Sequence, residues 1–111
     1  MDANIALRQR WLKAMRECPV RAIGRECDFA MSEGDVDRYD PIGLLALEAD
    51  WDFTDYPGCD GQYVPRMQAE YLAGMVGFPP DRLYDLCLMN DAGEPWPKIA
   101  AWCEWQMGLV K

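Results

Sequence analysis

Apolar residues return at steps of three and four along much of the chain, which predicts amphipathic helices joined by short polar segments. The first helix should begin after Asn4, a capping residue type, and extend to about Glu17, with Pro19 ending it. Its basic side chains point away from the apolar face, so we expect them to be solvated, with a binding surface as the alternative. The apolar face consists of Leu7, Trp11, Ala14, Met15 and Cys18.

Segment 40–49 differs from the others because it is apolar on nearly every side. Asp40 followed by Pro41 is a typical helix start, since the carboxylate caps the free N–H groups and proline suits the first turn. A helix without a polar face has to be covered on all sides. We therefore expect this helix to be the most buried, with the other helices packed around it.

Segment 65–75 predicts another helix, opened by Pro65 and ended near Gly74 and Gly77. We expect its apolar face to contain Met67, Tyr71, Leu72 and Met75. A shorter helix should follow Pro79 and Pro80, with apolar residues Leu83, Leu86, Cys87 and, less regularly, Leu88.

A polar turn at 90–93 separates that helix from a last one, which Pro95 and Pro97 open. Trp102 and Trp105 flank its apolar stripe and should lie at the edge of the core. Core packing is the main expectation for this helix, and a ligand pocket lined by the tryptophans is the alternative. The stripe consists of Trp96, Ile99, Ala100, Cys103 and Met107.

Between the first two helices the helical period is lost, and 32–35 has turn composition. We expect a small β-hairpin of 27–31 with 36–39, and a third short strand at 61–64. The predicted fold is α+β: a mainly helical single domain over 1–111, with about four to five helices and an antiparallel ribbon of two to three short strands.

The numbers of cysteines and histidines limit which metal sites and catalytic sites the chain can form. The 111 residues include five cysteines without a Cys-x-x-Cys pair and no histidine, so a structural zinc site is not expected. The missing histidine also removes the usual general base and nucleophile arrangements. We expect no enzyme activity, catalytic residue, metal or cofactor, and a cytoplasmic protein without a membrane span. The enzyme alternative uses carboxylates at Asp50 and Asp52, or at Asp91 and Glu94, to hold Mg²⁺ or to act as acid and base.

Charge is uneven along the chain, whose net charge is −8. Residues 1–25 hold six basic side chains against two acidic ones, and the remainder holds five against seventeen. Such an acidic body disfavours direct nucleic-acid binding and favours a basic protein partner. Acidic and aromatic residues interleave over 48–60, and the alternative is that these aromatics fold inward. The candidate partner-binding residues are Glu33, Asp35, Asp37, Glu48, Asp50, Trp51, Asp52, Asp55, Tyr56 and Asp60.

The order of these segments resembles a group of small phage and prophage proteins. The matching parts are Trp11-Leu12, a glycine-containing stretch at 24–34, the apolar helix at 41–48, the segment 64–77, and above all 88–104. The last of these is similar to a closing "L..LND.G.SF..IA.WIE" pattern. Asp40-Pro41 stands where the group has a double cysteine, so no role of that pair carries over.

The resemblance implies a phage-borne accessory protein, and similar small acidic phage proteins often inhibit host defence, anti-CRISPR proteins among them. We therefore expect an acidic inhibitor that binds a host protein with a basic nucleic-acid-binding surface, with a CRISPR effector subunit favoured, by nucleic-acid mimicry. The alternative is a homodimer, or a structural or regulatory module with a helix-in-groove partner, built on the Trp-rich C-terminal helix. Exposure of Trp102 and Trp105 would favour that alternative.

Overall fold

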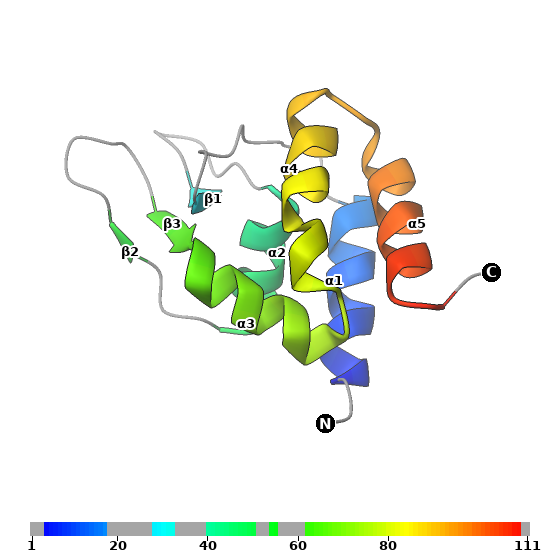
Figure 1. Ribbon diagram of the computed structural model, residues 1–111, viewed down its shortest axis with the longest axis horizontal. Coiled ribbons are helices and arrows are strands. Elements are labelled where there is room, and N and C mark those ends of the chain that lie inside the picture. Colours follow the sequence, from blue (N-terminus) through cyan, green and yellow to red (C-terminus); the bar gives the residue numbers. More distant parts are fainter. Residues whose placement is uncertain (1–3, 18–27, 33–39, 51–53, 56–61, 110–111) are drawn as a thin grey trace.

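Helices dominate the computed structural model, which describes residues 4–17, 28–32, 40–50, 54–55 and 62–109 (Figure 1). The described residues form five α-helices and a short 3₁₀ helix, η1. The predicted mainly helical fold is therefore confirmed. The helices are α1 (Ile5–Glu17), α2 (Pro41–Glu48), α3 (Arg66–Val76), η1 (Pro80–Arg82), α4 (Leu83–Asp91) and α5 (Trp96–Gln106).

Helix α2 lies at the centre and packs against α1, α3 and α4. Its start is the predicted one, because the Asp40 carboxylate accepts a 2.7 Å hydrogen bond from the backbone N–H of Gly43. All six residues from Pro41 to Ala46 are buried, whereas Leu47 is partly exposed. The all-round apolar pattern of this helix thus reflects neighbours on every side.

Helix α1 is joined to the rest of the fold by specific hydrogen bonds as well as by its apolar face. Asn4 caps its first turn through the side chain. The indole N–H of Trp11, a fully buried residue, donates to the Pro41 carbonyl oxygen at 2.6 Å. The Arg8 guanidinium donates to the Val76 carbonyl oxygen at 2.9 Å, at the end of α3. The bond of Trp11 satisfies polar groups that the packing removes from water.

Three short strands lie side by side in the order β1-β3-β2. They are β1 (Asp28–Ser32), β2 (Thr54–Asp55) and β3 (Gln62–Pro65), and both pairings are antiparallel. In the register, Phe29 is opposite Val64 and Thr54 is opposite Tyr63. The arrangement differs from the predicted hairpin, because β1 pairs with a strand that follows α2. The expected partner, 36–39, lies outside the described residues.

The apolar face predicted for α3 was partly wrong. Met67 and Tyr71 are exposed, Met75 is half-buried, and Leu72 alone of the predicted set is fully buried. The helix is turned so that alanine side chains face the interior. Two stripes of helical spacing are present on α3, and spacing alone cannot choose between them. The buried residues are Ala69, Leu72, Ala73 and Val76.

Among the described helices, none combines the length and the apolar character needed to cross a membrane.

Candidate partner-binding groove

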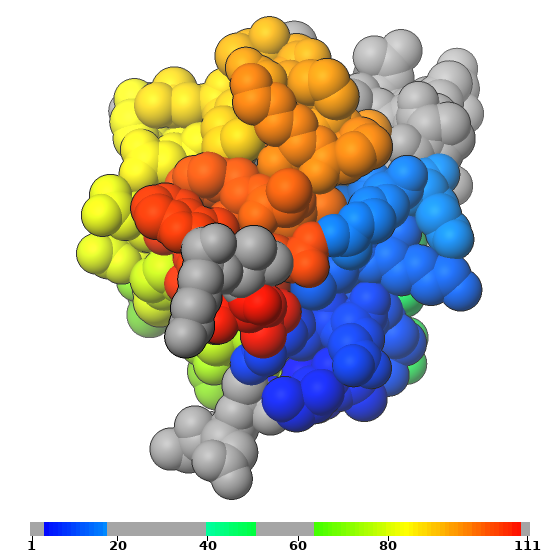
Figure 2. Space-filling model, turned by 90° about the vertical axis from the view of Figure 1, so that its right-hand side faces the viewer, coloured from blue at the N-terminus to red at the C-terminus, as the bar shows by residue number. Residues whose placement is uncertain are grey.

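Helices α4 and α5 form a helical hairpin on one side of the molecule, where they run in opposite directions (Figure 1). Leu83 and Leu86 anchor α4 in the core, and Ile99 and Cys103 anchor α5. Gly93, with a φ of +80°, makes the turn between the two helices. In the space-filling view, α5 occupies the middle of this face, with α4 on one side and α1 on the other (Figure 2).

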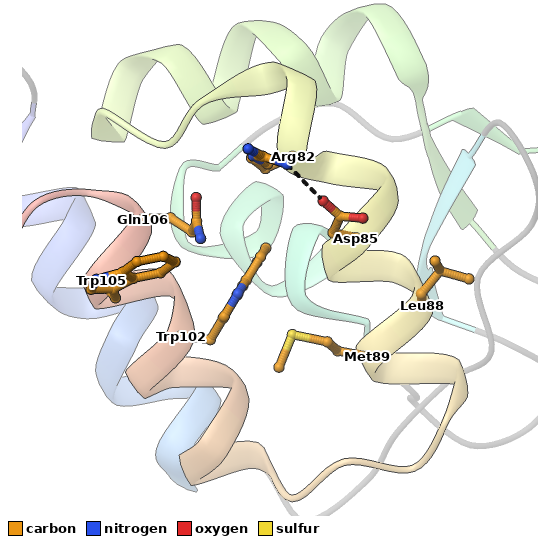
Figure 3. Close-up of a pocket in the computed structure, with 7 residues that line it drawn as sticks. All are labelled: Arg82, Asp85, Leu88, Met89, Trp102, Trp105 and Gln106. Atoms are coloured by element: carbon orange, nitrogen blue, oxygen red, sulfur yellow. Dashed lines mark hydrogen bonds and ion pairs between the residues drawn. The ribbon is translucent and has the colours of Figure 1, made fainter.

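A groove of about 480 Å³ lies between the facing sides of α4 and α5. Both of the tryptophans predicted to flank the apolar stripe of α5 contribute to its lining. Figure 3 shows the side chains that surround it, with α5 on one side and η1 and α4 on the other. The lining residues are Arg82, Asp85, Leu88, Met89, Trp102, Trp105 and Gln106.

Trp102 and Trp105 take different positions in this groove. Trp102 is half-buried, and its ring packs on that of Phe78, with the centroids 5.9 Å apart and the planes tilted by 58°. Phe78 in turn meets the buried ring of Trp11 edge-on at 5.8 Å. This aromatic series ties the floor of the groove to the core. Trp105, one turn further along α5, is 59% exposed and forms the rim.

The α4 side of the groove is apolar in its middle and polar at one end. Met89 reaches toward Trp102 (Figure 3), and Leu88, which is 48% exposed, lies at the edge of the lining. At the polar end, Arg82 and Asp85 form an ion pair of 3.4 Å. The groove therefore offers an apolar aromatic surface with a charged pair that can orient a ligand.

Carboxylates outnumber cations on the α4 side. Segment 80–91 carries Asp81, Asp85 and Asp91 against Arg82 alone, a net charge of −2. The basic side chains near α5 have carboxylate partners of their own: Lys98 pairs with Glu94 at 2.8 Å, and Arg16 pairs with Glu104. Within the groove Arg82 and Asp85 balance one another, and the excess of carboxylates belongs to the rest of segment 80–91 and to the chain as a whole.

The two described cysteines, Cys87 and Cys103, are held as neutral thiols. Burial raises the pKa of Cys87 from 9.0 to about 12, and the nearby negative charges of Asp91 and Asp40 act in the same direction. The Cys87 thiol also donates to the Asp91 carboxylate at 3.7 Å. Burial alone raises the pKa of Cys103. Because the thiolate is the reactive form, neither residue is an activated nucleophile.

The acidic residues predicted to bind a partner are only partly described. Glu48 is half-buried at the end of α2, and Asp50 is exposed two residues later with a φ of +53°, a conformation that aspartate tolerates. Asp55 belongs to β2, where it is opposite Gln62. The structure thus places Glu48 and Asp50 together at one end of α2. The remaining predicted residues lie outside the described part of the chain: Glu33, Asp35, Asp37, Trp51, Asp52, Tyr56 and Asp60.

Sequence reasoning identified Trp102 and Trp105 but missed the α4 side of the groove. One signal was present, because Leu88 departs from the apolar spacing of its helix and is indeed exposed. The spacing of Arg82 and Asp85, three residues apart, also permits their ion pair. That these side chains face the tryptophans follows only from the packing of the two helices.

A second hollow, of about 310 Å³, lies along α3 and is lined by Glu70, Tyr71, Gly74 and Met75. All four come from one helix, and among the described residues no second element contributes to the lining. In the part of the chain that the structure describes, no three side chains of the types His, Cys, Asp and Glu gather in a way that could hold a metal ion. Among these features, the groove between α4 and α5 is best suited to hold a partner.

Comparison of the chain with protein-family models, curated proteins and solved structures finds no match.

Proposed function

We propose that this chain is a non-enzymatic interaction protein that binds a partner protein through the groove between α4 and α5. The exposure of Trp105 beside the half-buried Trp102 carries the proposal. Large aromatic side chains are enriched in binding surfaces, where a few of them supply most of the affinity. Exposure of Trp105 is one half of what the sequence pattern required for a binding module built on the C-terminal helix, and Trp102 is exposed only in part.

Affinity capture from a bacterial lysate tests this function. The tagged wild type is compared with Trp105→Ala, and Met67→Ala serves as the control because Met67 is 83% exposed on a different helix. We expect the wild type and the control to retain the same proteins and Trp105→Ala to lose them. If all three baits retain the same proteins equally, the groove is not the binding surface.

A second candidate function is the acidic inhibitor of a host defence complex. The net charge of −8 supports it, as does the exposure of Asp50 at the start of the acidic segment. Carboxylates on a protein surface can occupy a Lys/Arg groove that otherwise holds phosphates. The target would be a basic nucleic-acid-binding protein, such as a CRISPR effector subunit, and the inhibitor would be phage-borne.

Charge reversal tests the second candidate. The bait would carry Asp50→Lys, Asp52→Lys, Asp55→Lys and Asp60→Lys, and the lysate would contain CRISPR effector complexes. We expect the wild type to retain a basic nucleic-acid-binding protein that is released as salt rises, because screening weakens charge pairing. Retention of that protein by the charge-reversed bait would rule out mimicry by this segment.

A further inference from the structure

We infer that the partner segment held by the groove is a basic amphipathic helix. This inference rests on the proposed function, because it names the chemistry of the ligand for the same site. Three properties of the groove lead to it: its length, its apolar floor and the charge around it.

The length of the groove fits a short helix. The lining residues extend over 82–89 on the α4 side and over 102–106 on α5, which is about 12 Å and about 8 Å at 1.5 Å per residue. A partner helix of about two turns therefore covers the groove from end to end. Two flanking helices with a recessed surface between them receive a third helix by placing its side chains between their own.

The floor of the groove suits an apolar stripe. Trp102 provides a flat aromatic surface that Phe78 holds in place, and Met89 faces it from α4. Methionine is flexible and polarisable, so it adapts to the shape of an inserted Leu, Ile or Phe side chain. A partner helix with apolar residues at steps of three and four presents such side chains on one face.

The surrounding charge selects basic residues on the other faces of the partner. Arg82 and Asp85 balance one another in the groove at 3.4 Å, and segment 80–91 as a whole has a net charge of −2. The exposed ring of Trp105 attracts a Lys or Arg side chain placed over it. The chain's net charge of −8 adds long-range attraction for a cationic segment.

A second copy of this chain fits the groove less well. Two copies each carry a charge of −8 and repel one another at low salt. The basic helix of the chain is α1, but its apolar residues Leu7, Trp11 and Met15 are buried in its own core. That helix cannot enter the groove of another copy without leaving its own fold.

Three fluorescein-labelled peptides of about 14 residues test the inference by fluorescence anisotropy with the full chain. The first has a leucine stripe at helical spacing and lysine elsewhere. The second keeps the stripe and replaces each lysine with glutamate. The third contains the residues of the first in an order without a stripe. We expect saturable binding of the first peptide, and at least about tenfold weaker binding of the other two.

Two protein variants locate the site. Trp105→Ala should weaken binding of the lysine peptide at least about tenfold, whereas Met67→Ala should leave it unchanged. Circular dichroism shows whether each variant remains folded. The inference is overturned if the glutamate peptide or the stripeless peptide binds as tightly as the lysine peptide. It is also overturned if Trp105→Ala binds the lysine peptide as tightly as the wild type does.

The remaining outcomes separate the inference from the proposed function. If no peptide binds but Trp105→Ala still loses partners in the lysate capture, the groove binds protein and the partner class is wrong. If both experiments fail, the proposed function fails as well. If sedimentation shows a dimer that Trp105→Ala dissociates, a second copy occupies the groove and the inference is overturned.

Discussion

Trp102 and Phe78 connect the candidate binding groove to the hydrophobic core, with their ring centroids 5.9 Å apart. Phe78 is almost completely buried and also contacts Trp11 at 5.8 Å, so one side chain supports both the interior and the groove floor. The position of Trp102 therefore depends on core packing, whereas Trp105 on the rim does not contribute to the buried cluster. A substitution of Trp102 should therefore affect both stability and binding, whereas a substitution of Trp105 should affect binding alone.

Phe78→Ala should lower the free energy of unfolding by about 3–5 kcal/mol, because it leaves a cavity between Trp11 and Trp102. Urea denaturation measures the change. Trp105→Ala is the matched control and should change stability by less than about 0.5 kcal/mol, because its side chain is exposed. If Phe78→Ala lowers the free energy of unfolding by no more than is expected for Trp105→Ala, Phe78 is not a core support.

Trp11→Phe tests the hydrogen bond between α1 and α2. The variant keeps an aromatic ring but removes the indole N–H that donates to the Pro41 carbonyl oxygen at 2.6 Å. Loss of this buried hydrogen bond should cost about 0.5–1.5 kcal/mol, so the urea midpoint should fall. Trp105→Phe makes the same chemical change at an exposed site and should have little effect. An unchanged midpoint for Trp11→Phe would mean that this bond contributes nothing.

Asp40 should stabilise α2 through its cap. Asp40→Ala removes the acceptor for the Gly43 N–H and should cost about 0.5–2 kcal/mol. Asp40→Asn keeps an oxygen acceptor and should retain most of the stability. Thermal unfolding followed by circular dichroism distinguishes the two. Equal losses in the alanine and asparagine variants would indicate that the negative charge of Asp40, and not its cap, is what matters.

Cys87 should make stability depend on alkaline pH. Its pKa is about 12 in the folded chain, against an ordinary value of 9.0, so the native state keeps a proton that the unfolded chain releases. Its contribution to stability is complete below about pH 9 and is lost as pH rises toward about 12. In Cys87→Ala the free energy of unfolding should therefore fall less between about pH 9 and about pH 12 than it does in the wild type. Urea denaturation at several pH values measures the difference.

Thiol alkylation followed by peptide mass mapping checks the same residue. At pH 8, Cys87 should react far more slowly in the folded chain than in urea, because little thiolate is present. Asp91→Asn should speed the reaction in the folded chain, since the charge and the hydrogen bond of Asp91 raise the pKa. A rate that is unchanged by Asp91→Asn would show that burial alone controls the thiol.

Substitution by alanine should change the stability of the fold in opposite directions at two glycines. Gly93 has a φ of +80°, and open space surrounds the place of a Cβ atom there, so Gly93→Ala should destabilise by about 1–2 kcal/mol through backbone strain alone. Gly74 lies within α3 with equally open space around it, and Gly74→Ala should stabilise by about 0.5–1 kcal/mol. Urea denaturation measures both variants. A loss of stability in Gly74→Ala would contradict the assignment of that site as an unstrained helical position.

The sequence by itself determined most of the helices. Asn4 and Asp40 cap α1 and α2 through bonds to groups three residues away, and the stripe of Trp96, Ile99, Ala100 and Cys103 is buried in α5 as expected. These features depend on side chains within one or two turns of each other, so the order of residues specifies them directly.

Tertiary structure decided the rest. The sequence did not reveal that α3 buries its alanines instead of Met67 and Tyr71, that β1 pairs with β3, or that Met89 faces Trp102. Each of these depends on contacts between residues that are distant along the chain, and several local patterns are compatible with each of them. The groove arises for the same reason: its two sides come from helices whose relative position is set by the core beneath them.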